Sequence, residues 1–197
     1  MDPRFSIERF RAALALASPD ALVPATPRAE RPSRPARERH TALRGRLAAI
    51  EGLAEGLAAG ATAEGVAVLA DIVHFFDSEL SPHMAAEEAI LYDLADRLAG
   101  LRAPLRYTDV LRHQHAAIAA RTDDLRSIAQ HAPRHWPRAS AIAIALVGLA
   151  RAHFDAEEDI VFELLDSRMT SEQFAHDIGE PTARWLEDRE AHARSAR

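Results

Sequence analysis

Two stretches of the chain carry closely spaced histidine and glutamate residues, which are residue types that bind metal ions. Residues 83–92 read HMAAEEAILY and residues 153–162 read HFDAEEDIVF, so the pattern HxxxEE occurs twice, seventy residues apart. On an α-helix, side chains four positions apart lie on one face, about 5 to 6 Å from each other. Each stretch therefore offers one imidazole and one carboxylate that point together: His83 with Glu87, and His153 with Glu157.

A lone histidine precedes each of these stretches. His40 opens the sequence HTAL and His115 opens HAAI. The order lone histidine, HxxxEE thus occurs twice, which indicates a duplicated helical hairpin. Four helices are then expected, each of which carries one of these groups.

The composition limits the chemistry of any such site. The chain has 197 residues, of which 48% are hydrophobic, and this suits one domain with a proper core and some extra segments. It contains no cysteine, which excludes disulfides, zinc–thiolate sites and iron–sulfur clusters. Any metal would be held by imidazole and carboxylate groups.

The hydropathy and charge patterns indicate where the protein works. The most apolar run, residues 141–150, is shorter than a membrane span and ends at Arg151, and the N-terminus lacks the pattern of a signal peptide. We therefore expect a cytoplasmic protein that does not contact a membrane. Residues 1–39 contain eight arginines and five acidic residues, which gives a net charge of +3. Because the whole chain has a net charge of −6, the remaining residues carry a net charge of −9. An acidic body argues against nucleic-acid binding.

Apolar periodicity predicts the elements that position the candidate ligands. The fold class is all-α: an up-down-up-down antiparallel four-helix bundle over residues 36–167, because the connections are short. The first two helices are expected at about residues 37–59 and 62–98, the third from Thr108 or Asp109 to about residue 130, and the fourth after a loop at residues 131–137. Pro82 is expected to kink the second helix near Ser78.

Two segments lie outside this bundle. Residues 1–35 form an arm rich in arginine and proline, with a short helix expected at 5–17, and this arm is either a solvated tail or a docking segment for an anionic partner. Residues 168–197 form a C-terminal helix and tail, which either lies across the bundle or mediates self-association.

The inward position of these polar residues favours a metal site. A single histidine on an apolar stripe is more often a hydrogen-bonded core residue. Four histidines and two glutamates on the inner faces of four helices, however, would each cost several kcal/mol if they were left unpaired. Helical histidine and carboxylate pairs in a bundle interior are a known way to hold two metal ions, and nitrogen and oxygen ligands suit iron or manganese.

The order of these motifs resembles the hemerythrin-like, or HHE cation-binding, domain. The resemblance implies two non-haem iron ions, with manganese as the alternative. It implies that the terminal ligands are His40, His83, His115 and His153, and that the bridging ligands are Glu87 and Glu157. Oxygen-carrying hemerythrins have an HxxxH pair on the third helix, whereas Leu111 and Ala119 flank His115 at that spacing. Their spacing on the last helix would also select Glu158 in place of Glu157. Reversible oxygen carriage is therefore not expected.

Three further residues could assist the site. Glu88 and Glu158 are either surface residues or groups that orient a ligand histidine. Tyr107 is a candidate hydrogen-bond donor to a metal-bound water.

Three functions stay open from the sequence. The first is a di-iron protein that reacts with or senses a small gaseous or peroxide ligand (oxygen, peroxide or nitric oxide), and whether it turns this ligand over as an enzyme is undecided. The second is an iron-handling or metal-dependent regulatory module without turnover. The third is a metal-free helical interaction protein.

Overall fold

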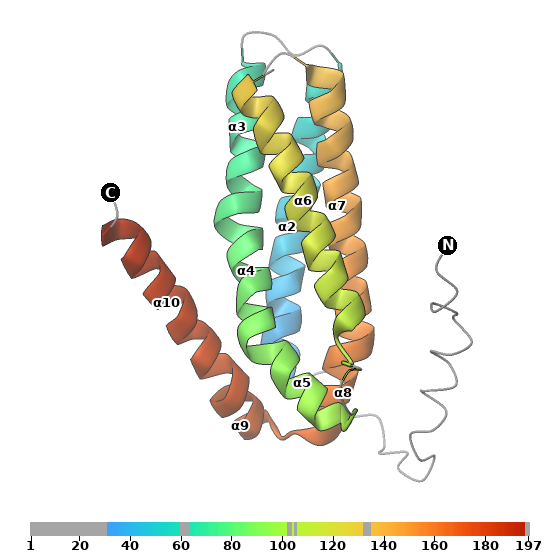
Figure 1. The fold of residues 1–197 in the computed structure, drawn as a ribbon, viewed down its shortest axis with the longest axis vertical. Coiled ribbons are helices and arrows are strands. Elements are labelled where there is room, and N and C mark those ends of the chain that lie inside the picture. The colour runs from blue at the N-terminus through green and yellow to red at the C-terminus, as the bar shows by residue number, and fades with distance from the viewer. Residues whose placement is uncertain (1–30, 60–63, 102–103, 105, 132–134, 196–197) are drawn as a thin grey trace, which may run out of the picture.

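The computed structural model describes residues 31–59, 64–101, 104, 106–131 and 135–195 (Figure 1). Within these residues all regular structure is helical, and the predicted all-α bundle is confirmed. Four long helices run alternately up and down, and a fifth lies at an angle along one side of them (Figure 1). The expected helix at residues 5–17 and the expected helix start at Thr62 lie outside the described residues.

The first two bundle helices follow the predicted bounds within a few residues. The first is α2, Arg34–Ala58. It begins three residues earlier than expected, because Pro35 lies in the first turn, where a missing N–H costs nothing. The second helix is continuous but has five segments: α3 Gly65–Phe75, η2 Phe76–Leu80, α4 Ser81–Ala86, η3 Glu87–Leu91 and α5 Tyr92–Ala99. It ends at Gly100, whose φ of 67° is a left-handed conformation that glycine adopts without strain.

The other helices complete the bundle and its cover. They are α6 Asp109–His131, then α7 Trp136–Glu157 continued by η4 Glu158–Phe162 and α8 Glu163–Arg168, and finally α9 Ser171–Phe174, η5 Ala175–Gly179 and α10 Glu180–Ser195. The helix Trp136–Arg168 is long and apolar enough to cross a membrane by length and composition alone. In this structure it is a wall of the core, and 44% of its most apolar window is buried.

The η segments are π-helical turns, in which each turn holds one residue more than in an α-helix. One of them, η2, ends two residues before Pro82 and includes Ser78, near which the sequence predicted a kink. Two others, η3 and η4, follow the histidines of the two HxxxEE motifs. Such turns are rare and are frequently found at functional sites.

The core consists of two apolar clusters with a polar layer between them. The larger cluster fills the end of the bundle near residues 59 and 135 and includes Leu47, Leu57, Leu69, Ile118 and Leu146. The smaller cluster fills the other end and includes Tyr92, Leu111, Phe162, Leu165 and Phe174. His40 lies between them, because its ring stacks on Phe154 of the larger cluster and packs against Phe162 of the smaller one.

The C-terminal helix uses its apolar face within the chain. Phe174 and Ile178 are buried, whereas Trp185 is only partly covered. The helix α10 packs across α4 and η3, the segments that carry His83 and Glu87. It therefore covers one side of the polar layer.

Candidate metal centre

The six residues predicted as ligands converge in the polar layer of the bundle. They are buried almost completely, and His83 is the most accessible, with 12% of its side chain exposed. They come from four helices: α2 supplies His40, the second helix supplies His83 and Glu87, α6 supplies His115, and α7 supplies His153 and Glu157. The sequence therefore predicted which side chains would meet.

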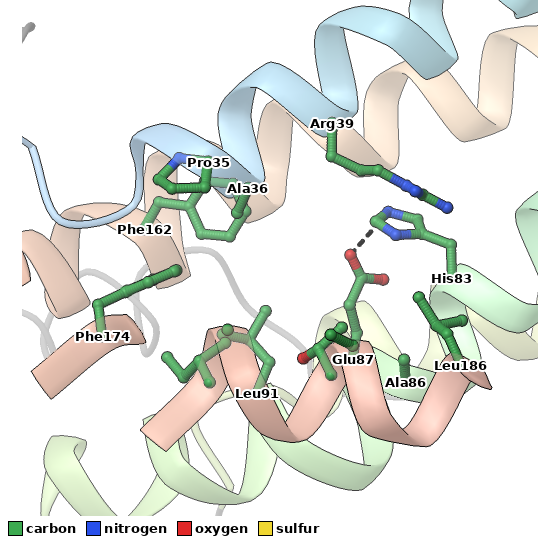
Figure 2. A pocket seen from close by; sticks show the side chains of 14 residues that line it. Pro35, Ala36, Arg39, His83, Ala86, Glu87, Leu91, Phe162, Phe174 and Leu186 are labelled. Atoms are coloured by element: carbon green, nitrogen blue, oxygen red, sulfur yellow. Dashed lines mark ion pairs between the residues drawn. The ribbon is translucent and has the colours of Figure 1, made fainter. Parts of the chain in front are cut away.

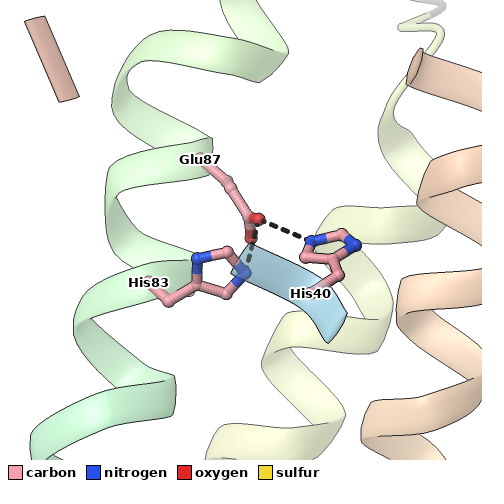
Figure 3. Close-up of side chains that lie close together, drawn as sticks. All are labelled: His40, His83 and Glu87. Carbon is pink, nitrogen blue, oxygen red and sulfur yellow. Dashed lines mark hydrogen bonds and ion pairs between the residues drawn. The ribbon is translucent and has the colours of Figure 1, made fainter. Parts of the chain in front are cut away.

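Glu87 lies at the centre of the group. Its Oε1 is 2.8 Å from His83 Nε2 and 3.5 Å from His40 Nε2, and its Oε2 is 3.5 Å from His115 Nε2. Figure 3 shows its carboxylate between the rings of His40 and His83. One oxygen thus faces the histidines of the first half of the chain, and the other faces the second half.

Glu157 lies opposite, and it is fully buried. Its Oε2 is 3.1 Å from His40 Nε2 and 4.0 Å from His153 Nε2. Two trios of potential ligand atoms result, each within 4.8 Å of one another: His40, His83 and Glu87, and Glu87, His115 and His153. Because the trios share Glu87, the arrangement has the form of two adjacent cation sites with a common carboxylate.

The buried polar atoms of this group fit bound cations. His83 Nε2, Glu87 Oε2 and both carboxylate oxygens of Glu157 form no well-directed hydrogen bond among the described residues, although His83 Nε2 lies 2.8 Å from Glu87 Oε1 and Glu157 Oε2 lies 3.1 Å from His40 Nε2. In addition, His115 Nε2 and His153 Nε2 face each other at 3.0 Å. Leaving such groups buried and unpaired costs several kcal/mol, whereas a cation would satisfy them together.

The charges of the site point the same way. Burial opposes a charge on His40, but its contacts with Glu157, Glu158 and Glu87 raise its pKa to about 11. Burial lowers the pKa of His153 to about 3. Burial and the negative charge of Glu87 raise the pKa of Glu157. Without metal, the two carboxylates are thus balanced by protons, which a metal ion would displace.

Three of the four histidines have a partner that holds the outer ring nitrogen. Glu158 Oε1 lies 3.1 Å from His40 Nδ1, and Glu88 Oε1 lies 2.9 Å from His115 Nδ1. The amide oxygen of Gln114 lies 3.0 Å from His153 Nδ1. Such partners fix the tautomer and the orientation of a metal-binding imidazole, so that Nε2 faces the centre.

The positions of Glu157 and Glu158 distinguish their roles. Glu157 points into the centre, whereas Glu158 lies on its outer side, where Arg44 Nη1 donates to it at 2.7 Å. The charges of His40 and Arg44 outweigh the effect of burial and lower the pKa of Glu158 to about 2. Of the two, Glu157 is therefore the residue that faces the centre, where a cation could bind.

A second layer of contacts repeats in both halves of the chain. Ser33 binds Asp166 through its backbone N–H and hydroxyl, and Thr108 binds Asp96 in the same way. An arginine one helical turn after each of these residues donates to its hydroxyl: Arg37 to Ser33, and Arg112 to Thr108. Each arginine also stacks over an aromatic ring of the other half of the chain, Arg37 over Phe162 and Arg112 over Tyr92. The duplication thus extends beyond the ligands, and it was hidden in the sequence because serine in one half stands for threonine in the other.

Tyr92 is a site residue that the sequence analysis did not identify. Its hydroxyl lies 3.2 Å from His115 Nε2, and its ring stacks on His115. Burial and the charges of Glu157 and Glu87 raise its pKa, so the hydroxyl stays protonated. In a regular α-helix a residue five positions after Glu87 would be turned away by about 140°, but the π-turn η3 brings Tyr92 to the inner face.

Tyr107 does not reach the centre. Its hydroxyl donates to the backbone carbonyl of Ile160 at 3.2 Å, which points it away from the ligand group. A contact with a metal-bound water stays an untested alternative. The remaining histidines of the described residues are exposed: His74, His113, His131, His135, His176 and His192.

Comparison with known proteins agrees with this geometry. Two segments of the chain, residues 34–109 and 106–196, match the family model of the hemerythrin HHE cation binding domain. The chain belongs to the hemerythrin HHE cation-binding family. Neither the curated proteins nor the solved structures give a match. The family assignment suggests metal binding, and the two histidine–glutamate trios of this hemerythrin-like protein could hold the metal. The boundary between the matched segments also falls where the two halves of the duplicated chain meet.

Proposed function

We propose that the protein holds two iron ions, with manganese as the alternative metal, and that this centre reacts with or senses a small oxidant or gas. The observation that carries the proposal is the pair of buried trios that share Glu87. Glu87 and Glu157 would bridge the ions, with His40 and His83 on one ion and His115 and His153 on the other. When bound, the ions would supply Lewis acidity and one-electron redox chemistry.

The surrounding residues would control what reaches this centre. Phe154 and Phe162 pack against His40 and exclude water from one side. Tyr92 places a protonated hydroxyl beside His115, where it can donate a hydrogen bond to a small ligand. His83 is the accessible edge of the group, so ligands would enter there.

A spectroscopic experiment tests the reaction class. The iron-loaded protein is reduced without air, exposed to oxygen, and then purged. Only two histidines are placed on each ion, so we expect oxidation without recovery of the reduced spectrum, together with a response of the oxidised form to peroxide or of the reduced form to nitric oxide. Full recovery on purging would show a carrier, and an inert iron centre would favour an iron-handling or regulatory role.

A cytoplasmic location, the absence of membrane and nucleic-acid partners, and self-association through the C-terminal helix are further proposals from the sequence. The last is tested by light scattering of the full chain beside Trp185→Ser, since Trp185 is the partly exposed aromatic residue of that helix. An equal mass for both proteins, corresponding to one chain, would reject it.

A further inference from the structure

An apolar cavity of about 260 Å³ lies between the C-terminal helix and the bundle and ends at the candidate metal centre. Figure 2 shows Arg39, His83 and Glu87 together at one end, with the apolar Ala86 and Leu186 beside them, and Phe162 and Phe174 toward the other end. The rest of the lining is almost entirely apolar. A ligand with one polar end and one apolar end would match it.

The duplication of the chain shows what is unusual at the polar end. Arg39 directly precedes His40, as Gln114 directly precedes His115. Gln114 accepts a hydrogen bond from His153 Nδ1, but arginine has no acceptor and cannot do the same for His83. Among the described residues, His83 Nδ1 has no hydrogen-bond partner and Arg39 has neither an ion pair nor a hydrogen bond. Two donors at the polar end are therefore available to a ligand: Arg39, which is exposed to solvent, and His83, which is 12% exposed.

These donors call for an oxygen acceptor with a negative charge. When Nε2 of a histidine faces a metal, its proton lies on Nδ1, so His83 can only donate from that side. A guanidinium group forms paired hydrogen bonds with a carboxylate. The charge of Glu87 does not oppose this, because three histidines already contact its carboxylate.

The volume of the cavity indicates the length of the apolar part. The cavity is partly open to solvent. By comparison with an engineered, closed cavity of about 150 Å³ that binds benzene, with six carbons, its volume of about 260 Å³ corresponds to about ten carbons. We propose that the cavity binds a medium-chain fatty acid, with its carboxylate between Arg39 and His83 and its chain against Leu91, Phe174 and Ile178. This inference rests on the proposed function in one respect, because a metal ion at Nε2 would fix the proton of His83 on Nδ1, but it requires neither oxidation nor reduction.

Calorimetric titration of the metal-loaded full chain with carboxylates of increasing length tests the proposal. We expect acetate not to bind measurably and affinity to increase about fourfold for each methylene up to about ten carbons, without further gain beyond. Equal affinities for acetate and decanoate, or no binding of decanoate, would overturn it.

Two variants test the two ends of the cavity. Arg39→Gln should weaken decanoate binding by about tenfold and leave decanol binding unchanged; Arg138→Gln, an exposed arginine at the far end of the bundle, is the matched control. Gly179→Leu fills the apolar part, and it should weaken decanoate and decanol alike by at least about tenfold. A Cβ at Gly179 meets only the carbonyl oxygen of Phe174, at 3.8 Å, so the substitution does not strain the backbone.

Metal content and melting temperature are measured for each variant in parallel. The site would be refuted if Arg39→Gln bound decanoate with the same affinity as Arg138→Gln. It would also be refuted if Gly179→Leu bound decanoate with the parent's affinity. If the purified chain binds no metal but still binds carboxylates with this chain-length dependence, the fatty-acid site stands and the di-iron proposal fails. If the chain binds two ions but not decanoate, the fatty-acid site fails alone, so the two failures are distinguishable.

Discussion

Replacing Glu157 and Glu158 separately by glutamine distinguishes a bridging ligand from a residue that orients a ligand. Both residues follow His153 in the same motif and both contact His40. Glu157 contacts its Nε2 from inside the centre, whereas Glu158 contacts its Nδ1 from outside. The two substitutions make the same chemical change on opposite sides of one imidazole ring.

The expected magnitudes differ because the two residues do different things. Glutamine at 157 leaves a neutral amide where a carboxylate would join two cations, so we expect the metal content to fall from two ions to one or none. Glutamine at 158 keeps an oxygen that accepts from His40 Nδ1 and loses only the charge. A hydrogen bond to a charged group contributes about 1.5 to 3 kcal/mol when buried, and Glu158 is 20% exposed, so the lower end applies. We expect an affinity loss of about tenfold, at the lower end of the range for such partners.

The assay is a competition titration against a chelator, with metal content measured by mass spectrometry. Glu163→Gln is the matched control, because Glu163 pairs with Arg37 on the same outer surface and contacts no histidine of the site. It should bind two ions with the parent's affinity. A Glu157→Gln variant that keeps both ions, beside a Glu158→Gln variant that loses them, would reverse the assignment of the two residues.

Three further predictions concern the ligands, the protons and the N-terminal boundary. His153→Ala should lower metal occupancy strongly, whereas His113→Ala, at an exposed position, should keep the parent's content; equal losses in elemental analysis would contradict the ligand set. Because the pKa of His40 is raised to about 11, the metal-free protein carries this proton at pH 7; metal binding should release about one proton from His40, and affinity should increase with pH until that pKa. Calorimetry in buffers of different ionisation enthalpy measures this release, and no release would refute it. The same shift should stabilise the metal-free fold fully below pH 6.5, with the gain lost as the pH rises through about 11. Deleting residues 1–30 should leave the melting temperature unchanged, whereas a deletion that includes Ser33 should lower it by about 3 to 8 °C, because the contact with Asp166 is lost. A fall in melting temperature on deletion of residues 1–30 alone would show that the arm contributes to the bundle.

The fold and the inner residues of the site were predictable because both follow from helical periodicity. Apolar residues at intervals of three and four placed the bundle helices, and the spacing of HxxxEE placed His83 beside Glu87 without knowledge of the tertiary structure. The duplication then related the two halves. The bundle and the family were confirmed, whereas the identity and number of the metal ions stay predictions.

The outer parts of the site were not predictable because they depend on departures from that periodicity. The π-turn after Glu87 rotates Tyr92 inward, and no residue type in the motif signals such a turn. The comparison of Tyr92 with Phe162 in the repeat could have drawn attention to the hydroxyl. Gln114 was missed because it directly precedes a predicted ligand and lies off the apolar stripe. The hydroxyl of Tyr107 bonds a backbone carbonyl, which its position in the sequence does not indicate.

The most direct test of the account is the number of metal ions per chain. The protein is expressed in medium supplemented with iron, purified, and analysed by elemental mass spectrometry together with quantitative protein determination. Two trios that share one carboxylate predict two iron ions per chain. A single ion would contradict the paired site, and a chain that binds neither iron nor manganese would contradict the account of the buried histidines and glutamates as metal ligands.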